Sequence, residues 1–513
     1  MRIGIDVGGT NTDSVLMEGD TVLAGTKAHT TDDISTGIVN SLDGLKAERD
    51  FDPGAIEAVM IGTTHFVNAF VEARRLVKVA ALRLGLPATA SLPPMVDWPQ
   101  RLVEATGGRS YLAHGGHEFD GREISPLDPD EIKRIAADMR ANGVEAVAVS
   151  SVFSPVNDEF EVRAAEILAE ELGPAVAISL SSRIGRTGLL GRENAAIANA
   201  ALSAMAQTVV GGFERSLADY GVTAPLFLSQ NDGTLMGADY ARQYPISTFS
   251  SGPTNSMRGA AVLSGLEDCA VVDVGGTTSD IGILVNKFPR EANTEVEIGG
   301  VRTNFRMPDV YSIGIGGGSL VSGDAVVGPQ SVGYRLTTEA LVFGGTTLTA
   351  SDIAVAAGMA QMGDPSRVAH LDKEFVASAV QRIADDVADA VDRMRTSSDP
   401  LPVVAVGGGS ILLPDRLPGL GEMVRPDNFA VANAIGAAIA QIGGEIDQVF
   451  TVAPGTRDNV VTEAREAAVE RAVEAGADRD TVRIVDFDEV PLPYLPGNAT
   501  RIRCKAVGDL KGA

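Results

Sequence analysis

The chain is poor in cysteine and in basic residues. Its 513 residues include two cysteines, Cys269 and Cys504, which lie far apart and lack the spacing of a metal site. So few cysteines fit a reducing compartment, and we expect the protein in the cytoplasm. Lys and Arg number 42 against 68 Asp and Glu, so the formal net charge is −26. This deficit of positive charge argues against binding to nucleic acids and to anionic membrane surfaces.

Long apolar runs and the commonest nucleotide-binding loop are missing as well. No stretch of about 18 apolar residues occurs, so no membrane-spanning helix is predicted. Asp6 interrupts the first apolar run, which therefore lacks the pattern of a signal peptide. The chain contains no Gly-Lys pair and hence no G-x-x-x-x-G-K-[ST] phosphate loop.

One stretch of the sequence occurs twice. Asp6–Asp13 reads DVGGTNTD and Asp273–Asp280 reads DVGGTTSD, so six of the eight positions are identical. Short apolar runs of strand character precede and follow each copy. Each copy is therefore predicted to join strand to strand as a hairpin, whereas the two commonest phosphate loops join a strand to a helix. Because the copies are separated by the length of a large lobe, we expect two related lobes with one hairpin each.

Each hairpin combines an acidic residue with glycines and small hydroxyl side chains. Paired glycines let backbone N–H groups approach an anion without interference from a Cβ atom. Hydroxyl donors come from Thr10, Thr12, Thr277, Thr278 and Ser279. The leading Asp would repel a bare phosphate, but it suits Mg²⁺, which binds carboxylate, water and phosphate oxygens together. The alternative is a pair of acidic glycine turns without a ligand.

Three further glycine-centred loops are candidates for the same site. Gly62–Thr64 follows a strand and opens a predicted helix, which makes either an anion site or an ordinary helix start. Gly407–Ser410 follows an apolar run and suits either close approach to a base or ribose, or a tight turn. Gly314–Ser319 contains a broken dinucleotide-binding fingerprint without a βαβ unit.

Length, composition and hydrophobic pattern predict the organisation of the rest of the chain. With 513 residues and 44% apolar residues, we expect two to four domains with sizeable cores. Residues 86–126 are rich in Pro, Gly and His and predict a long loop or small insertion. There His114 and His117 form a weak metal signal, with solvated loop histidines as the alternative. Alternating strands and helices at 128–180 predict a largely parallel sheet covered by helices.

We therefore divide the chain into three parts. The N-terminal lobe comprises residues 1–183, with the loop insertion at about 86–126. The second lobe comprises residues 184–450. A helix-and-strand appendage of α+β character comprises residues 451–513.

Several of these stretches together resemble known proteins. The two acidic hairpins and the later Gly-Gly-Gly loop resemble the actin, Hsp70 and sugar-kinase superfamily, in which two ribonuclease-H-like lobes clamp Mg-ATP in a cleft. Within it, the chain is similar to the hydantoinase A / 5-oxoprolinase family. The resemblance is carried by DVGGTNTD (6–13), GTTHFVNAFVE (62–72), SSGPTNSMRGA (250–260), DVGGTTSDIGIL (273–284), SIGIGGGSL (312–320), GGTTLTASD (344–352) and LPYLPGNATRIR (492–503).

The resemblance implies an α/β fold of two ribonuclease-H-like lobes and an ATP-dependent ring opening of a cyclic amide. Hydantoins, 5-oxoproline and lactams are the family's substrates, and phosphorylation of the carbonyl oxygen activates them for water. The implied cofactors are ATP and Mg²⁺, and the implied partner is a second, metal-binding subunit or another copy of the chain. The chain departs from the family's pattern at Ile61, where His is typical, with His65 inside the motif instead. It is also shorter than the usual large subunit.

Carried onto this sequence, the resemblance assigns the candidate site residues. The catalytic candidates are Asp6, Asp13, Asp273 and Asp280. Asp6 and Asp273 would bind Mg²⁺ directly or through water. Asp13 and Asp280 would either position water or metal, or cap the hairpin turns. The β- and γ-phosphates would be held by Gly8, Gly9, Thr10, Gly275, Gly276, Thr277 and Thr278, with Asn11 and Thr12 beside them. The adenosine would lie at Gly407, Gly408, Gly409 and Ser410, and Gly316 and Gly317 complete the nucleotide set. The substrate end would hold Thr63, Thr64 and Asn68.

Three functions stay open at this point. The first is an ATP-dependent hydrolase subunit for cyclic amides. The second is a small-molecule kinase of the same superfamily, which would release a stable phosphorylated product. The third is a non-catalytic ATP-gated partner protein that uses lobe closure as a switch.

Overall fold

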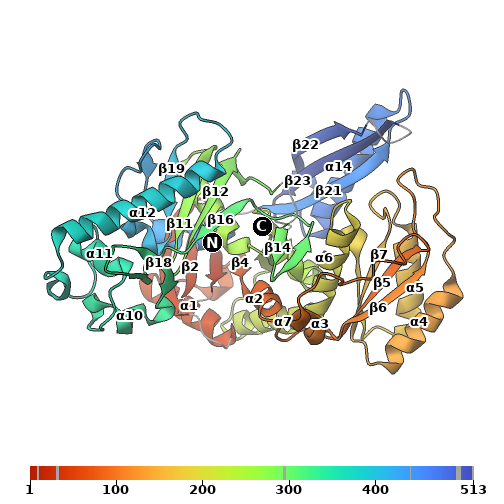
Figure 1. Ribbon diagram of the computed structural model, residues 1–513, viewed down its shortest axis with the longest axis horizontal. Coiled ribbons are helices and arrows are strands. Elements are labelled where there is room, and N and C mark those ends of the chain that lie inside the picture. Colours follow the sequence, from red (N-terminus) through yellow and green to blue (C-terminus); the bar gives the residue numbers. More distant parts are fainter. Residues whose placement is uncertain (9–10, 30–33, 293–295, 440, 493–497, 511–513) are drawn as a thin grey trace.

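The computed structural model describes residues 1–8, 11–29, 34–292, 296–439, 441–492 and 498–510, and Figure 1 shows its helices and strands. Within these residues the strands form two large mixed sheets, one parallel sheet of four strands and two small hairpins. Gly9 and Thr10, which are predicted to bind phosphate, lie outside the described residues.

The first large sheet has nine strands and contains the N-terminal hairpin. Its order is β22 (Arg483–Pro491), β23 (Ala499–Gly508), β21 (Ile442–Thr451), β10 (Leu235–Gly237), β9 (Leu226–Ser229), β4 (Ala58–Thr63), β1 (Arg2–Val7), β2 (Asn11–Glu18) and β3 (Thr21–His29). Strands β1, β2 and β3 pair antiparallel, whereas β4 runs parallel to β1 and β9 runs parallel to β4. Helices cover both faces of β1 and β4, which explains their nearly continuous apolar sequences.

The second large sheet contains the second hairpin and has the same arrangement. Its order is β13 (Phe288–Pro289), β12 (Ser279–Val285), β11 (Cys269–Val274), β19 (Val403–Val406) and β20 (Met423–Val424), and β16 (Val310–Ile313) also pairs with β12. Here too three strands that follow one another in the chain, β11, β12 and β16, pair antiparallel. Strand β19 then runs parallel to β11, and β20 runs parallel to β19. This repeated order is that of a ribonuclease-H-like sheet. The prediction of two such lobes is confirmed.

Helices sandwich both of these sheets. In the first lobe, α13 (Ala432–Ile439) packs on one face, and α1 (Ile34–Glu48) and α7 (Ser203–Asp219) pack on the other. In the second lobe, α9 (Ser251–Ser264) packs on one face and α12 (Lys373–Met394) on the other. Helices α9 and α13 also pack against each other, so they form the junction between the two lobes.

A separate parallel sheet follows the first lobe's β4 in the chain. Its order is β6 (Arg109–His114), β5 (Val79–Leu86), β7 (Ala146–Ser151) and β8 (Ala177–Leu180). One face packs on α4 (Pro129–Ala141) and α5 (Glu159–Leu172), and the other on α6 (Leu189–Ala201). In Figure 1 this unit lies at one end of the molecule, and α12 lies toward the other end.

The segment at 86–126 differs from the predicted loop insertion. It contains α3 (Gln100–Thr106) and the edge strand β6. Most side chains of β6 are exposed or only partly buried, so its sequence lacks the apolar alternation that would have identified a strand.

Strand pairing also crosses the predicted domain boundaries. β9 and β10 lie beyond residue 184 but join the first lobe's sheet, and so does β21. The predicted appendage continues that sheet through β22 and β23, and α14 (Arg457–Glu474) packs on β21 and β23. These pairings join segments hundreds of residues apart, which no local pattern in the sequence reports.

The remaining elements are short. They are α2 (His65–Val71), α8 (Ala238–Gln243), α10 (Leu336–Glu339), α11 (Ala350–Ala356), β14 (Val296–Ile298), β15 (Val301–Thr303), β17 (Ser319–Val321) and β18 (Val327–Ser331). No single described helix is long and apolar enough to cross a membrane. The pair α6 and α7, bent by 53°, satisfies the same criteria of length and composition when taken together.

Candidate functional site

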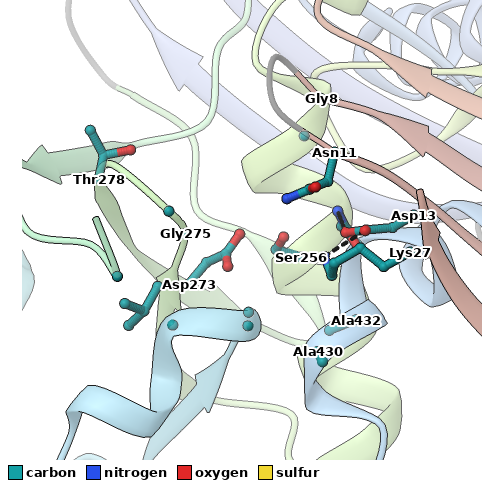
Figure 2. A pocket seen from close by; sticks show the side chains of 18 of the residues that line it. Gly8, Asn11, Asp13, Lys27, Ser256, Asp273, Gly275, Thr278, Ala430 and Ala432 are labelled. Atoms are coloured by element: carbon teal, nitrogen blue, oxygen red, sulfur yellow. Dashed lines mark hydrogen bonds and ion pairs between the residues drawn. The ribbon is translucent and has the colours of Figure 1, made fainter. Parts of the chain in front are cut away.

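The two acidic hairpins face one cavity of about 460 Å³ between the lobes (Figure 2). The Gly407–Gly409 loop and the beginnings of α9 and α13 complete its wall. Its lining includes these residues of the predicted site: Asp6, Gly8, Asn11, Asp13, Thr64, Asp273, Gly275, Gly276, Thr278, Asp280, Gly317, Gly407, Gly408 and Gly409. The fold therefore brings together segments that lie far apart in the sequence.

Each hairpin presents two carboxylates to this cavity. Asp6 lies directly opposite Asp13 in the β1–β2 pair, and Asp273 lies opposite Asp280 in the β11–β12 pair. Side chains directly opposite in an antiparallel pair lie on the same face of the sheet. The predicted hairpins are thus present, and their geometry is the same in both lobes.

The turns of the two hairpins are closed in the same way. The Gly8 amide donates to the Asn11 carbonyl oxygen at 3.0 Å, and the Gly275 amide donates to the Thr278 carbonyl oxygen at 2.9 Å. These two N–H groups are therefore already used within the protein. An anion bound here would therefore need other donors at the hairpin tips.

Asp6 is buried and held by two amide side chains. Asn255 Nδ2 donates to its Oδ1 at 3.1 Å, and Asn433 Nδ2 donates to its Oδ2 at 3.0 Å. Burial, the largest cause, and the charge of Asp13 raise the pKa of Asp6 to about 6. The carboxylate is thus fixed in orientation while its negative charge is poorly compensated.

Asp13 has a basic neighbour that the sequence did not indicate. Lys27 lies opposite Asp13 in the β2–β3 pair, and its Nζ is 2.5 Å from Asp13 Oδ1. Asn433 Nδ2 also donates to Asp13 Oδ2 at 2.8 Å. Among the described lining residues, Lys27 is the single basic side chain. It therefore supplies positive charge to a cavity dominated by carboxylates.

The carboxylates of the second hairpin have no neighbour equivalent to Lys27 among the described lining residues. Burial, followed by the charges of Asp280 and Asp6, raises the pKa of Asp273 to about 7, although a Ser256 hydrogen bond opposes this. Burial likewise raises the pKa of Asp280, whose Oδ1 accepts from Ser312 Oγ at 2.5 Å. The charge of Asp6 thus opposes ionisation of Asp273, and a divalent cation between two such carboxylates would relieve this repulsion.

Glycine is required where the loops touch the second hairpin. Gly407 has φ +82°, and a Cβ atom there would lie 2.2 Å from Asp273 Oδ1. A Cβ atom at Gly316 would lie 2.6 Å from the Thr277 amide nitrogen. The Gly317 amide donates to the Gly275 carbonyl oxygen at 3.0 Å. Both Gly-Gly-Gly loops thus pack directly against the hairpin backbone.

Six predicted residues lie outside the described lining. Thr12, Thr63, Gly316 and Ser410 are buried behind the wall, whereas Thr277 and Asn68 are exposed. Asn68 Nδ2 donates to Thr64 Oγ1 at 3.3 Å, and Thr63 Oγ1 lies 2.6 Å from His65 Nδ1. Of the predicted substrate end, Thr64 alone reaches the cavity in the described structure.

The two loop histidines have different surroundings. His114 is exposed, with its Nδ1 3.1 Å from Glu131 Oε2. His117 is 2% exposed and stacks on Phe160 with ring centroids 4.4 Å apart, so the expectation of a solvated side chain is wrong for it. Among the described residues, no group of three or more His, Cys, Asp or Glu could hold a metal. The metal candidate at His114 and His117 therefore gains no support.

Four side chains that line the cavity or contact its aspartates were missed from the sequence. They are Lys27, Asn255, Ser256 and Asn433. Asn255 and Ser256 belong to the stretch SSGPTNSMRGA, so a signal for them was present. Lys27 and Asn433 carry no local motif, because strand register and helix crossing bring them to the site.

Comparison with known proteins shows the family. The family model for the hydantoinase/oxoprolinase N-terminal region matches residues 2–172, and the model for hydantoinase/oxoprolinase matches residues 192–399. The chain belongs to the hydantoinase/oxoprolinase family. Together the two matches cover most of the chain, and they include both acidic hairpins.

The sequence identity to individual relatives is low. The chain is 27% identical to the acetophenone carboxylase gamma subunit of Aromatoleum aromaticum over 398 residues, which cover 69% of this chain and 53% of that subunit. It is 26% identical to the caprolactamase subunit alpha of Pseudomonas jessenii over 496 residues, which cover 88% and 69% respectively. The chain thus spans about half the length of the first relative.

A solved structure supports the fold. The crystal structure of the ATP-dependent caprolactamase from Pseudomonas jessenii matches with a TM-score of 0.79 and 18% sequence identity. The match covers 100% of this chain and 88% of that chain.

Proposed function

We propose that the chain binds Mg-ATP in the cavity between its lobes and uses it to open a cyclic amide. The observation that carries this proposal is the pair of matching hairpins, which point four carboxylates from two lobes into one cavity. A nucleotide whose phosphates bridge the lobes would join these hairpins, because phosphoryl transfer depends on positioning and on charge neutralisation.

Two carboxylates suit Mg²⁺, which takes its other ligands from water and phosphate oxygens. Asp6 and Asp273 offer hard carboxylate oxygens from opposite sides of the cavity, and burial, the largest cause, raises their pKa values to about 6 and 7. Bound Mg²⁺ would neutralise phosphate charge and hold the phosphates in place. Asp6 and Asp273 would hold it directly or through water.

The nucleotide would extend from the hairpin tips to the Gly407 loop. Gly276 and Thr278 offer donors at the tip of the second hairpin, and Lys27 offers a cation beside the first. Gly408, Gly409 and Ile411 line the other end of the cavity. A flat base can approach such a glycine backbone closely, so we place the adenosine there. Ser410 is buried and would support this loop from behind.

The proposed reaction has two stages. In the first, the amide carbonyl oxygen attacks the γ-phosphorus, the bond to the bridging oxygen breaks, and ADP leaves. In the second, water adds to the carbonyl carbon, the carbon–nitrogen bond breaks as nitrogen takes a proton, and the ring opens to an acyl phosphate. A second water releases phosphate and the carboxylate. The chain's part is to hold the phosphates in line and to stabilise the charge that develops.

The relatives support this class of chemistry. By their names, one acts on a caprolactam ring and the other on acetophenone, and both compounds carry a carbonyl group that ATP can activate. Both relatives are subunits of larger enzymes, so we also propose that this chain works with a second subunit. The partner would complete the reaction after carbonyl activation.

Phosphate release from Mg-ATP tests the proposal. The purified chain, alone and with any co-purifying partner, is assayed over hydantoin, 5-oxoproline, caprolactam and acetophenone. Stimulation by a cyclic amide together with its ring-opened product is the expected result. A stable phosphorylated product would instead establish the kinase, and ATP binding without stimulation would favour the gated partner. Stimulation by acetophenone with bicarbonate would establish ketone carboxylation in place of ring opening.

A further inference from the structure

Helix α9 begins between the two lobes, and two consecutive side chains of its first turns hold one aspartate from each hairpin. Asn255 Nδ2 donates to Asp6 Oδ1 at 3.1 Å, while Ser256 lines the cavity together with Asp273 and lowers the pKa of that carboxyl group. In Figure 2 the Ser256 side chain points toward the Asp273 carboxylate. Successive residues of an α-helix point about 100° apart, which is what lets neighbours on one helix reach two lobes.

The start of α9 is anchored by the other junction helix. A Cβ atom at Gly436 of α13 would lie 1.8 Å from the Asn255 carbonyl oxygen, and one at Gly259 of α9 would lie 1.9 Å from the Ala432 carbonyl oxygen. The two backbones are therefore in direct contact. Any change in the crossing of α9 and α13 would move Asn255 and Ser256 together.

Close packing at Gly62 leaves no room for a side chain beside the Asp6–Asn255 hydrogen bond. Gly62 lies beside Asp6 in the β1–β4 pair, and a Cβ atom there would lie 2.2 Å from Asp6 Oδ1 and 2.3 Å from Asn255 Nδ2. The rotamers of both side chains are thus set by their neighbours. Such locked outer partners are what orient carboxylate ligands toward a metal.

One hydrogen-bond acceptor of this arrangement, the Asn255 side-chain oxygen, has no partner among the described residues. Asn255 is 0% exposed. A buried amide oxygen without a partner costs free energy unless something donates to it. A water molecule bound to a cation beside Asp6 would be such a donor, since Mg²⁺ keeps several waters in protein sites.

From this geometry we propose that Asn255 and Ser256 are a positioning pair, which orients Asp6 and Asp273 toward a single shared divalent cation. This inference rests on the proposed Mg-ATP site and adds to it the residues that couple the cation to the lobe junction. A merely structural role for the pair would affect the stability of the protein but not its dependence on Mg²⁺.

The test uses the full chain and a fixed concentration of a non-hydrolysable ATP analogue. Calorimetry measures binding of the analogue as MgCl₂ is titrated. Ser256→Ala and Asn255→Ala are each expected to raise the Mg²⁺ concentration for half-maximal binding about tenfold or more, the usual cost of losing an outer-shell partner. Ser256→Thr keeps the hydroxyl and should restore the wild-type value. Ser264→Ala, in the last turn of the same helix, removes a bond to the Ala260 carbonyl and one from the Leu266 amide, and neither involves a residue of the cavity, so it is the matched control.

Thermal unfolding without Mg²⁺ separates the two roles. A lower melting temperature with an unchanged Mg²⁺ midpoint in both alanine variants would overturn the inference. If Asn255→Ala fails to fold, Ser256→Ala and its threonine rescue still decide the question. Failure of the wild-type chain to bind Mg-nucleotide at all would instead refute the proposed function.

Discussion

Asp6 and Asp273 occupy equivalent places in two lobes, yet their surroundings differ. Asp6 accepts from two asparagine side chains, whereas Asp273 is held by Ser256 and lies against Gly407. The lobes thus share a backbone plan but contribute different side chains to the cavity. At the scale of residues, this asymmetry makes each aspartate separately testable.

Replacing either aspartate should weaken nucleotide binding. We expect Asp6→Asn and Asp273→Asn each to lower Mg²⁺-dependent affinity for the nucleotide at least about tenfold, because a direct ligand contributes no less than its outer-shell partners. Equilibrium binding with and without EDTA measures this effect. Asp415→Asn is the control, since that side chain is 97% exposed. An effect from only one aspartate would contradict a cation site shared by the lobes.

The same aspartates should make the metal-free protein less stable at neutral pH. The pKa values of about 6 for Asp6 and 7 for Asp273 exceed the ordinary value of 3.8, so the folded state retains protons that the unfolded state has lost. The stability that these groups contribute is complete below about pH 4 and is lost as the pH rises through 6 and 7. In EDTA, we expect Asp273→Asn to raise the melting temperature at pH 8 and to change it little near pH 4. An equal shift at both pH values would contradict this cause.

At the scale of elements, the crossing of α9 and α13 depends on glycine. A Cβ atom at Gly436 would overlap the Asn255 carbonyl oxygen, whereas Gly212 in α7 has no neighbouring atom within 4 Å of such a Cβ. This pair of positions separates the effect of close packing from that of helix propensity.

Gly436→Ala should therefore destabilise the protein by about 1–3 kcal/mol, the usual cost of overpacking. Gly212→Ala should stabilise it by up to about 1 kcal/mol, because alanine favours helix without a clash. Chemical denaturation measures both changes. Equal effects of the two variants would show that the lobe junction tolerates separation of its helices.

At the scale of the whole molecule, buried charges bind the C-terminal strands to the lobes. Lys505 on β23 is 4% exposed, and its Nζ lies 3.0 Å from Asp232 Oδ2. Arg503 Nη2 lies 2.8 Å from Glu291 Oε2, and Arg501 pairs with Asp447 on β21. Since the pairs of Lys505 and Arg503 join β23 to segments remote in sequence, we expect β21–β23 to unfold together with the lobes.

Loss of one partner in this cluster should be costly. Lys505→Ala leaves the Asp232 carboxylate buried without its closest cation, and we expect a loss of about 3–5 kcal/mol in unfolding free energy. Lys287→Ala, in a half-exposed pair with Glu267, is the control and should change stability by less than about 1 kcal/mol. Denaturant unfolding should show one transition in the wild type. A separate early transition for the C-terminal strands would contradict their integration into the first sheet.

The sequence by itself determined the features that depend on neighbouring residues. The two hairpins, their paired aspartates and the glycine loops follow from local patterns, because a strand–turn–strand unit sets its own register. The repeat of one motif in two halves, together with the family resemblance, was sufficient to predict two ribonuclease-H-like lobes. These predictions needed no information on how distant segments meet.

The tertiary structure alone decided which side chains share the cavity. Asn433 reaches Asp6 across 427 residues of sequence, and Asn255 reaches it across 249. Thr63 and Ser410 are buried behind the wall although their motifs resemble those at the site, and β9, β10 and β21 to β23 extend a sheet begun at the N-terminus. Strand order and helix crossing angles arise from packing over the whole core, so local periodicity carries no record of them.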